Sequence, residues 1–506
     1  MKPIIYQVLT RLYGNTKSTC QHGGTLEQNG SGKMNDFTAR RLAALRDRGY
    51  THIWYTGLLD HATGTDFSAF GLPADDTSLV KGIAGSPYAV RDYYNVAPEL
   101  AVSIPDRLKE FDNLVRRTHR AGLKVVMDFI PNHVAANYIG SVNPFTDANF
   151  YPGRLHDGDW TDTAKLNYGN HDTWEKMRDI LFFWTKRGVD AFRCDMAELV
   201  PVEFWEWVIP QVKALRPHLL FIAEVYQPWQ YRSYIEHGHF DYLYDKVGLY
   251  DTLIALLKGH ESATAITRCW QSLGDIGAHM LHFLENHDEQ RLASSFICGD
   301  GRRALPALVI SALMDTCPLM CYFGQEYGES GMETEGFSGI DGKTTIFDYW
   351  SIGTIRRHID DTLHSDFTNT QADDELTKKE NILAEEYEKV FRICSTEPAV
   401  SEGKFFDLMY VQNEDFDIHR QYAFLRHHDG ALLLVCANFA DYPVNVRVRL
   451  PEHAFSYFGI ADDSPARLYA CTDLLSGYST TLPLSSASPV PLTIQAISAA
   501  VVKFAL

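Results

Sequence analysis

The chain has 506 residues, 45% of them hydrophobic and 12% aromatic, which is enough apolar sequence for a large core and excludes a disordered chain. Its 46 Lys and Arg residues against 65 Asp and Glu give a net charge of −19 at pH 7. A surface this acidic repels nucleic acids and anionic membranes, so we expect neither as a partner, whereas a neutral substrate is compatible with it.

Short apolar, β-branched runs alternate with amphipathic helical patterns along most of the chain. The eight predicted strands are residues 4–8, 51–56, 124–130, 189–195, 219–225, 242–246, 279–285 and 319–324. The helices predicted between them include residues 37–48, 106–121, 172–187, 201–216 and 301–316. This alternation predicts an α/β fold, a (β/α)8 TIM barrel, in which the active-site loops follow the C-terminal ends of the strands.

Two long insertions interrupt the alternation, residues 57–104 after the second strand and residues 134–171 after the third. Loops of this length in a compact fold are usually functional, and both emerge at the catalytic rim. After a polar helical stretch at residues 376–393, the sequence changes to short strands separated by turns. We therefore predict a catalytic barrel at residues 1–397, with an inserted subdomain at 134–171, and a C-terminal all-β domain, a β-sandwich, at 398–506.

The nine cysteines show no metal-binding spacing, because no CxxC pair or Cys/His cluster occurs in the sequence. Buried thiols in a reducing compartment are the expected state. The first residues, MKPIIYQVLTRLYGN, have no basic region followed by a long apolar core and a cleavage site, and no apolar run is long enough to span a membrane. The sequence therefore predicts a cytoplasmic enzyme.

Four segments place polar residues at the ends of predicted strands. They are KVVMDFIPNH (124–133), VDAFRCDMAE (189–198), FIAEV (221–225) and FLENHD (283–288). A single Asp or His in such a place is usually a turn, a helix cap or a satisfied rim residue. Four such segments, each at the end of a barrel strand, indicate instead a shared site on one face of the barrel.

The carboxylates of these segments suit glycoside hydrolysis with retention, which needs a nucleophilic carboxylate and a protonated carboxylic acid about 5–5.5 Å apart. Asp195 and Glu224 end consecutive strands, and neighbouring strands lie ~4.8 Å apart. Arg193, on the same side of its strand as Asp195, is expected to keep Asp195 ionised. The apolar sequence before Glu224 predicts surroundings that favour its neutral form, as an acid requires. Asp288, with His287 beside it, is expected to bind sugar hydroxyls and stabilise an oxocarbenium-like transition state.

These segments resemble the four signature regions of the α-amylase superfamily, glycoside hydrolase family 13, and the resemblance covers most of residues 1–397. It implies Asp195 as nucleophile, Glu224 as acid/base and Asp288 as transition-state stabiliser. Further matches are GYTHIWYT (49–56) on the second strand and PLMCYFGQE (318–326) on the eighth. The all-β C-terminal domain is similar to the family's own C-terminal domain.

The same resemblance implies a ring of substrate-binding residues, which are Tyr88, His133, Arg193 and His287. It also implies two structural supports, Asp128 and Asn132. Tyr88 stands in the segment SPYAVRDY, which resembles the family's loop whose Tyr stacks under the sugar being cleaved. A flat aromatic ring against the C–H face of a sugar is a suitable platform on physical grounds as well.

Two segments depart from the family pattern. DMAEL (195–199) lacks the Lys-His pair that many α-amylases carry after the nucleophile, and TAKLN (163–167) resembles the neopullulanase-type variant of the fifth region. Lys165 stands where calcium-binding relatives bring an Asp, so an ammonium would repel Ca²⁺ beside Asn132. We therefore expect no calcium at the family's usual site and no other cofactor. The alternative is a metal held by other oxygens, from Asp157, Asp159 or Asp162.

The leading interpretation is hydrolysis of α-glucosidic, mainly α-1,4, bonds in starch-derived glucans or maltodextrins. Transglycosylation or glucosyl isomerisation shares the covalent intermediate and is the alternative. An inactive carbohydrate-binding relative is a remote third, because all three carboxylates are present. Oligo-1,6-glucosidases are similar in having an Arg at the place of Arg291, but they also carry an Asp directly after the stacking Tyr. Ala89 stands there, so we expect an open subsite rather than exo-acting release of glucose.

Overall fold

The computed structural model describes residues 2–334, 337–359, 371–463 and 467–506, with only the backbone for 371–374. Eight parallel strands close into a barrel in which β1 pairs with both β2 and β12. They are β1 (Ile4–Leu9), β2 (His52–Thr56), β5 (Lys124–Phe129), β8 (Ala191–Cys194), β9 (Leu220–Ala223), β10 (Tyr242–Tyr244), β11 (Met280–Phe283) and β12 (Leu319–Tyr322). The predicted TIM barrel and its eight strands are confirmed.

Side chains that point into the barrel form a compact apolar plug, which includes Ile5, Trp54, Val126, Ala191, Ile222, Tyr244, Leu281, Phe283 and Met320. Successive side chains of a strand alternate between its two faces. The next inward-facing positions after Val126, Ala191 and Ile222 are therefore two residues further along each strand. These positions are Asp128, Arg193 and Glu224, which places the polar residues directly above the apolar plug.

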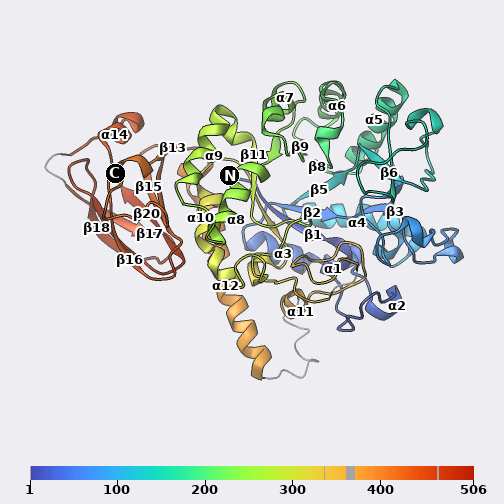
Figure 1. Cartoon of the computed structure of the whole chain (residues 1–506), viewed down its shortest axis with the longest axis horizontal. Helices are drawn as coiled ribbons and strands as arrows, with labels where there is room; N and C mark the ends of the chain where they lie inside the picture. The colour runs from blue at the N-terminus through green and yellow to red at the C-terminus, as the bar shows by residue number, and fades with distance from the viewer. Residues whose placement is uncertain (1, 335–336, 360–370, 464–466) are drawn as a thin grey trace.

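Helices surround the barrel (Figure 1). They are α3 (Ala39–Asp47), α4 (Arg107–Arg120), α5 (His171–Lys186), α6 (Val202–Leu215), α7 (Tyr231–Glu236), α8 (Asp251–Leu257), α9 (Ala265–Leu273) and α10 (Leu305–Leu313). The helices predicted at 37–48, 106–121, 172–187 and 201–216 are confirmed. The one predicted at 301–316 is shorter, because a 3-10 turn (Gly301–Ala304) precedes α10. Among the described residues, no helix combines the length and apolar character needed to cross a membrane.

Both insertions form small antiparallel pairs beside the barrel. The first contains β3 (Leu59–His61) and β4 (Val90–Val96), and the second contains β6 (His133–Ala135) and β7 (Thr163–Lys165). The two insertions contact each other, since the Tyr93 ring lies 6.4 Å from Tyr138 and 6.0 Å from Phe145. Together they build a wall on one side of the barrel mouth.

The C-terminal region is built from two antiparallel sheets. The larger has the order β13 (Lys404–Asp407), β14 (Gln421–His428), β15 (Ala431–Asn438), β20 (Ser498–Ala505), β17 (Leu468–Asp473) and β18 (Ser479–Pro483). The smaller pairs β16 (Val444–Val448) with β19 (Val490–Ile494). A short helix that the sequence did not predict, α14 (Glu452–Phe458), follows β16. The predicted all-β C-terminal fold is otherwise confirmed.

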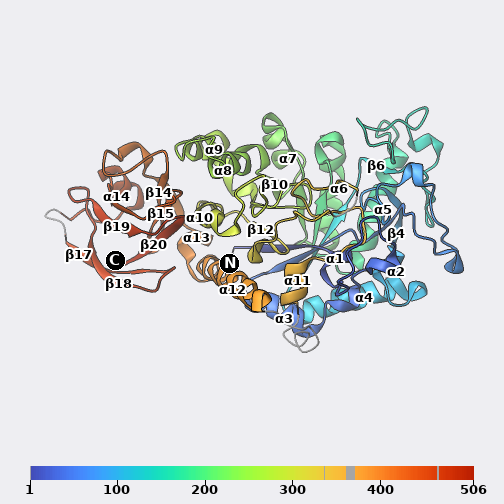
Figure 2. The ribbon, with the colours of Figure 1, turned by 60° about the horizontal axis from the view of Figure 1, so that its bottom comes forward.

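The remaining helices are α1 (Thr10–Tyr13), α2 (Leu26–Asn29), α11 (Gly353–His358), α12 (Gln371–Thr396) and α13 (Pro398–Ser401). The C-terminal sheets lie against the side of the barrel that carries α10 and α13 (Figures 1 and 2). Arg426 of β14 joins the two parts, because its guanidinium donates to the carbonyl oxygens of Met314 and Ala399 at 2.9 Å each. The C-terminal sheets therefore stand beside the barrel wall and away from its mouth.

Candidate active site

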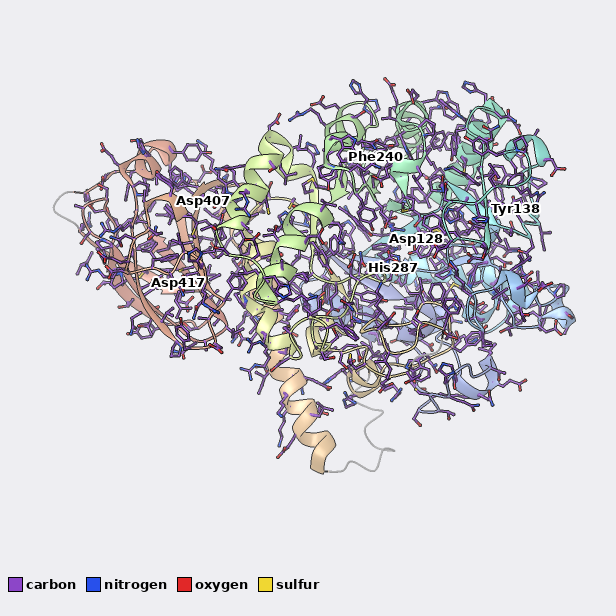
Figure 3. All side chains as sticks on the ribbon, in the orientation of Figure 1. Asp128, Tyr138, Phe240, His287, Asp407 and Asp417 are labelled. Carbon is purple, nitrogen blue, oxygen red and sulfur yellow. The ribbon has the colours of Figure 1, made fainter. Side chains whose placement is uncertain are left out.

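A cavity of about 340 Å³ opens at the C-terminal end of the barrel strands. Six of the nine predicted site residues line it: Tyr88, His133, Asp195, Glu224, His287 and Asp288. Arg193 and Asp128 lie beneath them, and both are buried. Asn132 instead points into the second insertion, where its amide donates to Asp157. In Figure 3, Asp128 and His287 appear in the middle of the barrel, far from the C-terminal sheets.

The strand register places Asp195 beside Glu224. Cys194 of β8 pairs with Ala223 of β9, so the residues that follow them are neighbours across the two strands. The Glu224 N–H donates to the Cys194 carbonyl at 3.1 Å, which extends the pairing to the residues in question. The adjacency predicted from consecutive strands is therefore present.

One guanidinium links the carboxylates. Arg193 Nη1 lies 2.8 Å from Asp195 Oδ1 and 3.6 Å from Asp128 Oδ1, and Arg193 Nη2 lies 2.7 Å from Glu224 Oε1. The rings of Trp54, Tyr88 and Tyr244 surround the guanidinium at 5.4–5.5 Å. These rings and the carboxylates hold Arg193 in one orientation, with no part of its side chain exposed.

The cluster has more acidic groups than cations. Burial raises the pKa of Asp195 well above its usual value, Arg193 opposes this shift, and the charges of Glu224 and Asp288 add to it. Burial also raises the pKa of Asp128, to about 6, and that of Asp288. Burial and mutual repulsion therefore favour the protonated forms of Asp195, Asp128 and Asp288, against the opposing charge of Arg193. Arg193 pairs with Asp195 as predicted, but burial outweighs it, so the expectation that Asp195 is simply kept ionised needs this correction.

The surroundings of Glu224 differ from those predicted. Its carboxyl meets polar donors rather than an apolar pocket, because Oε1 accepts from the Tyr226 hydroxyl at 2.6 Å and Oε2 accepts from the Met196 N–H at 2.8 Å. The apolar residues before it pack elsewhere: Phe221 and Ala223 face the helices, and Ile222 belongs to the plug. The residues of a strand indicate what surrounds the strand itself. The carboxyl of Glu224 extends beyond the strand, so the loops determine its surroundings.

A hydrogen-bonded chain supports the predicted binding residues. The Gln7 amide contacts His287 Nδ1 at 2.8 Å, and His287 Nε2 lies 2.5 Å from the Tyr88 hydroxyl. Burial lowers the pKa of His287, so the ring is neutral; with Gln7 donating to Nδ1, Nε2 carries the hydrogen. The Tyr88 hydroxyl in turn donates to Asp128 Oδ1 at 3.4 Å. His287 Nε2 also lies 3.1 Å from Asp288 Oδ2.

A glycine lets the loop of Tyr88 approach the first insertion closely. Gly85 has φ of +83°, and a β-carbon there would lie 1.8 Å from the carbonyl oxygen of Ala62. Any other residue would push this loop outward. Tyr88 thus stays at the cavity wall with its ring 5.1 Å from His287 and partly exposed, as a sugar platform requires.

Lys165 occupies the region where the family's calcium would be sought. Its Nζ lies 2.7 Å from Asp157 Oδ1, and the Asn132 amide donates to Asp157 Oδ2 at 2.8 Å. Burial alone would raise the pKa of Asp157, but these two hydrogen bonds outweigh it, so the pKa lies below its usual value. An ammonium and an amide N–H on the same carboxylate do not fit a calcium ion at this place. The expectation of no calcium stays a prediction.

Sequence reasoning missed several cavity residues, which are Lys81, Ser86, Trp160, Asp162, Thr163, Met196, Tyr226, Ile346 and Phe347. Tyr226 follows Glu224 by two positions, and strand periodicity could have indicated it. Lys81 and Asp162 come from different insertions and form an ion pair of 3.1 Å on the cavity wall. Arg291, by contrast, does not line this cavity: it is buried and pairs with Glu285 at 2.8 Å.

Comparison with known proteins gives a consistent result. The family model described as "Alpha amylase, catalytic domain" matches residues 155–384. The chain is 24% identical to Alpha-amylase 3 of Dictyoglomus thermophilum over 358 residues, covering 63% of this chain and 68% of that protein. It is 26% identical over 216 residues to an alpha-1,4-glucan:maltose-1-phosphate maltosyltransferase of Cereibacter sphaeroides, covering 38% of this chain and 33% of that protein. The matches thus span from about a third to two thirds of these curated relatives.

Solved structures resemble nearly the whole chain. An alpha-amylase from Lactobacillus plantarum is 21% identical with a TM-score of 0.67, covering 99% of this chain and 98% of that one. An alpha-amylase from Geobacillus thermoleovorans, complexed with acarbose, is 17% identical with a TM-score of 0.68 and the same coverage of both chains. At these identities the likeness shows a shared fold, from the barrel to the C-terminal sheets.

Proposed function

We infer that this chain, which belongs to the α-amylase family of glycoside hydrolases, is a retaining enzyme. Its proposed reaction is the cleavage of α-1,4 glucosidic bonds in starch-derived glucans or maltodextrins. The observation that carries this proposal is the pair of adjacent carboxyl groups, Asp195 and Glu224, that share Arg193 on the floor of one cavity. Neighbouring barrel strands lie ~4.8 Å apart, which is compatible with the about 5–5.5 Å between carboxyl groups that a double displacement requires.

The reaction follows from their positions. Asp195 attacks the anomeric carbon while Glu224 gives its proton to the leaving glycosidic oxygen, so the C–O bond breaks as the glycosyl ester forms. Glu224 then takes a proton from water, which attacks the same carbon and releases Asp195. Two inversions give net retention. The first step needs Glu224 protonated and Asp195 ionised, and Arg193, which pairs with both carboxyls, stabilises the negative charge on Asp195.

The remaining wall suits a neutral sugar. Asp288 and His287 stand together where they can bind two neighbouring hydroxyls and stabilise positive charge at the anomeric carbon. Tyr88 offers its ring as a platform, and His133 and Trp160, with ring centres 5.4 Å apart, form the side facing the second insertion. The Asp and Arg that oligo-1,6-glucosidases carry near this subsite are not available here, because Ala89 stands in place of the Asp and Arg291 is turned toward Glu285.

Transglycosylation is the second candidate, favoured by the similarity to a maltosyltransferase over 38% of the chain. It uses the same residues and differs in whether water or a sugar hydroxyl attacks the covalent intermediate. The compartment is also a proposal: each of the nine cysteines, all of them within the described residues, is a free thiol, which suits a reducing cytoplasm.

Proton NMR of maltoheptaose digests tests the proposed reaction. We expect new reducing ends to appear first as the α-anomer, with maltose and maltotriose among the early products. A β-anomer as the first product would overturn retention, and glucose as the sole early product would overturn the open subsite. Products longer than maltoheptaose would identify the transferase alternative.

A further inference from the structure

The loops that follow β8 and β9 are cross-linked through each other's backbone. From the first loop, the Met196 N–H donates to Glu224 Oε2 at 2.8 Å. In return, Glu198 of the first loop accepts the N–H groups of Tyr226 at 2.9 Å and Gln227 at 3.1 Å. Each loop therefore supplies a carboxylate that caps backbone donors of the other.

Tyr226 completes this arrangement. Its hydroxyl donates to Glu224 Oε1 at 2.6 Å, while its ring borders the cavity. Burial and the charge of Glu224 raise the pKa of the phenol, so the hydroxyl stays protonated and acts as a donor. Because the last torsion of a Glu side chain is broad, donors on both oxygens are needed to fix the plane of its carboxyl. Tyr226 and Met196 supply hydrogen bonds to the two oxygens, beside the ion pair of Oε1 with Arg193.

The backbone at Met196 adopts the left-handed conformation, with φ of 42° and ψ of 45°. Residues with a β-carbon rarely adopt this left-handed conformation, and strain of this kind clusters at functional sites. The strained residue directly follows Asp195 and sends its N–H to Glu224. The turn therefore fixes the two proposed reacting carboxyls relative to each other.

We propose that Glu198 is a positioning residue that holds Tyr226 so that its hydroxyl orients the Glu224 carboxyl for proton transfer. The inference rests on the proposed function, in which Glu224 is the acid/base. Glu198 itself does not line the cavity and acts only through the backbone of Tyr226. It occupies the segment in which many α-amylases carry a Lys-His pair, so this device belongs to this chain's own departure from the family pattern.

The test compares four variants, Tyr226→Phe, Glu198→Ala, Glu198→Gln and the double variant Glu198→Ala/Tyr226→Phe. Tyr226→Phe removes a hydrogen bond to the charged form of the acid, so the basic limb of the kcat/KM profile should move up by about one pH unit. We expect kcat on maltoheptaose to fall about tenfold. Glu198→Ala should shift the limb in the same direction, whereas Glu198→Gln keeps an acceptor oxygen and should restore the wild-type profile.

Two further readouts separate positioning from a merely structural role. An aryl α-maltoside with a good leaving group needs less help from the acid, so Tyr226→Phe should slow it much less than maltoheptaose. The double variant should be no worse than Tyr226→Phe alone, because both changes act through one contact. Tyr478→Phe, on a side chain 69% exposed in the C-terminal region, is the matched control and should leave both substrates unaffected.

Equal losses on both substrates with an unmoved pH profile would overturn the proposal, as would additive effects in the double variant. If Glu198→Ala does not fold, as judged by circular dichroism, Glu198→Asp takes its place: its carboxylate is one methylene shorter, so it should weaken the contact with the Tyr226 N–H and shift the basic limb in the same direction. A fully active Glu224→Gln variant would instead overturn the proposed function, which keeps the two failures distinct.

Discussion

A buried cluster of carboxyl groups and a single buried carboxylate are stabilised in different ways in this molecule. At the barrel mouth, Asp195 and Glu224 share the charge of Arg193 with further carboxyls. At the contact between the barrel and the C-terminal sheets, Asp407 is also buried, but no cation accompanies it among the ion pairs of the described residues. Figure 3 shows the two places well apart, with Asp407 at the left and Asp128 inside the barrel.

Asp407 is satisfied entirely by neutral donors. Its Oδ2 accepts from Thr267 at 2.6 Å and from the Trp270 indole at 2.9 Å, both on α9. The same oxygen accepts from the Tyr422 hydroxyl at 2.7 Å, and Oδ1 accepts from the Met409 N–H at 2.6 Å. A carboxylate with four donors stabilises the contact between the two parts, whereas the crowded carboxyls at the mouth raise the pKa of Asp195. Buried acids of one chemical type thus serve stability in one region and reactivity in the other.

The sharpest test of this contrast removes the charges of the crowded cluster. Asp195→Asn and Glu224→Gln should each lower kcat by several orders of magnitude, because one lacks the nucleophile and the other the acid. The melting temperature should stay close to that of the wild type, since each change also relieves repulsion among the carboxyls. Azide should partly rescue small-residue variants at these positions, giving glycosyl azides of opposite anomeric configuration. Substantial unfolding of either variant would show that these residues serve stability, as Asp407 does.

The second test removes Asp407 itself. Asp407→Ala leaves four donors without an acceptor at a buried contact, so we expect a loss of about 3 kcal/mol or more in the free energy of unfolding. Activity per folded molecule should change little, because the contact lies away from the cavity. Urea denaturation measures the loss, and Asp415→Ala, on a side chain 51% exposed, is the control. If Asp407→Ala were as stable as this control, the four donors would have no net effect on stability.

A third test uses pH. Burial raises the pKa of Asp128 from 3.8 to about 6, although Arg193 lowers it. The folded state therefore binds this proton more tightly than the unfolded chain, and stability is gained below about pH 4 and lost as the pH rises through 6. Asp128→Asn removes the titration, so its stability relative to the wild type should increase between pH 4 and 6. Asp429→Asn should show no such trend in the same urea series, and a flat difference for Asp128→Asn would contradict the argument.

Much of this architecture could be predicted because the side chains of a strand alternate between its two faces. Asp128, Arg193 and Glu224 each follow an inward-facing apolar residue by two positions, so the strands alone place them at the mouth. The helices α7 to α9 were not among those predicted. Ile346 and Phe347 could not be predicted, because their loop is placed by contacts distant in sequence. The N–H groups of Ala84 and Gly85, for example, donate to the Phe347 carbonyl at 3.0 and 3.2 Å.

Asp157 allows the comparison to be extended to the second insertion, with the smallest expected effect. It resembles Asp407 in having its charge satisfied by the protein itself, through Lys165 and Asn132. Dialysis against EDTA should therefore leave activity unchanged and the melting temperature within about a degree, and metal analysis should find no stoichiometric calcium. Lys165→Ala should lower stability by only about 1 kcal/mol, because the pair is about a quarter exposed. A calcium ion whose removal lowers the melting temperature by many degrees would show that Asp157 or its neighbours Asp159 and Asp162 hold a metal after all.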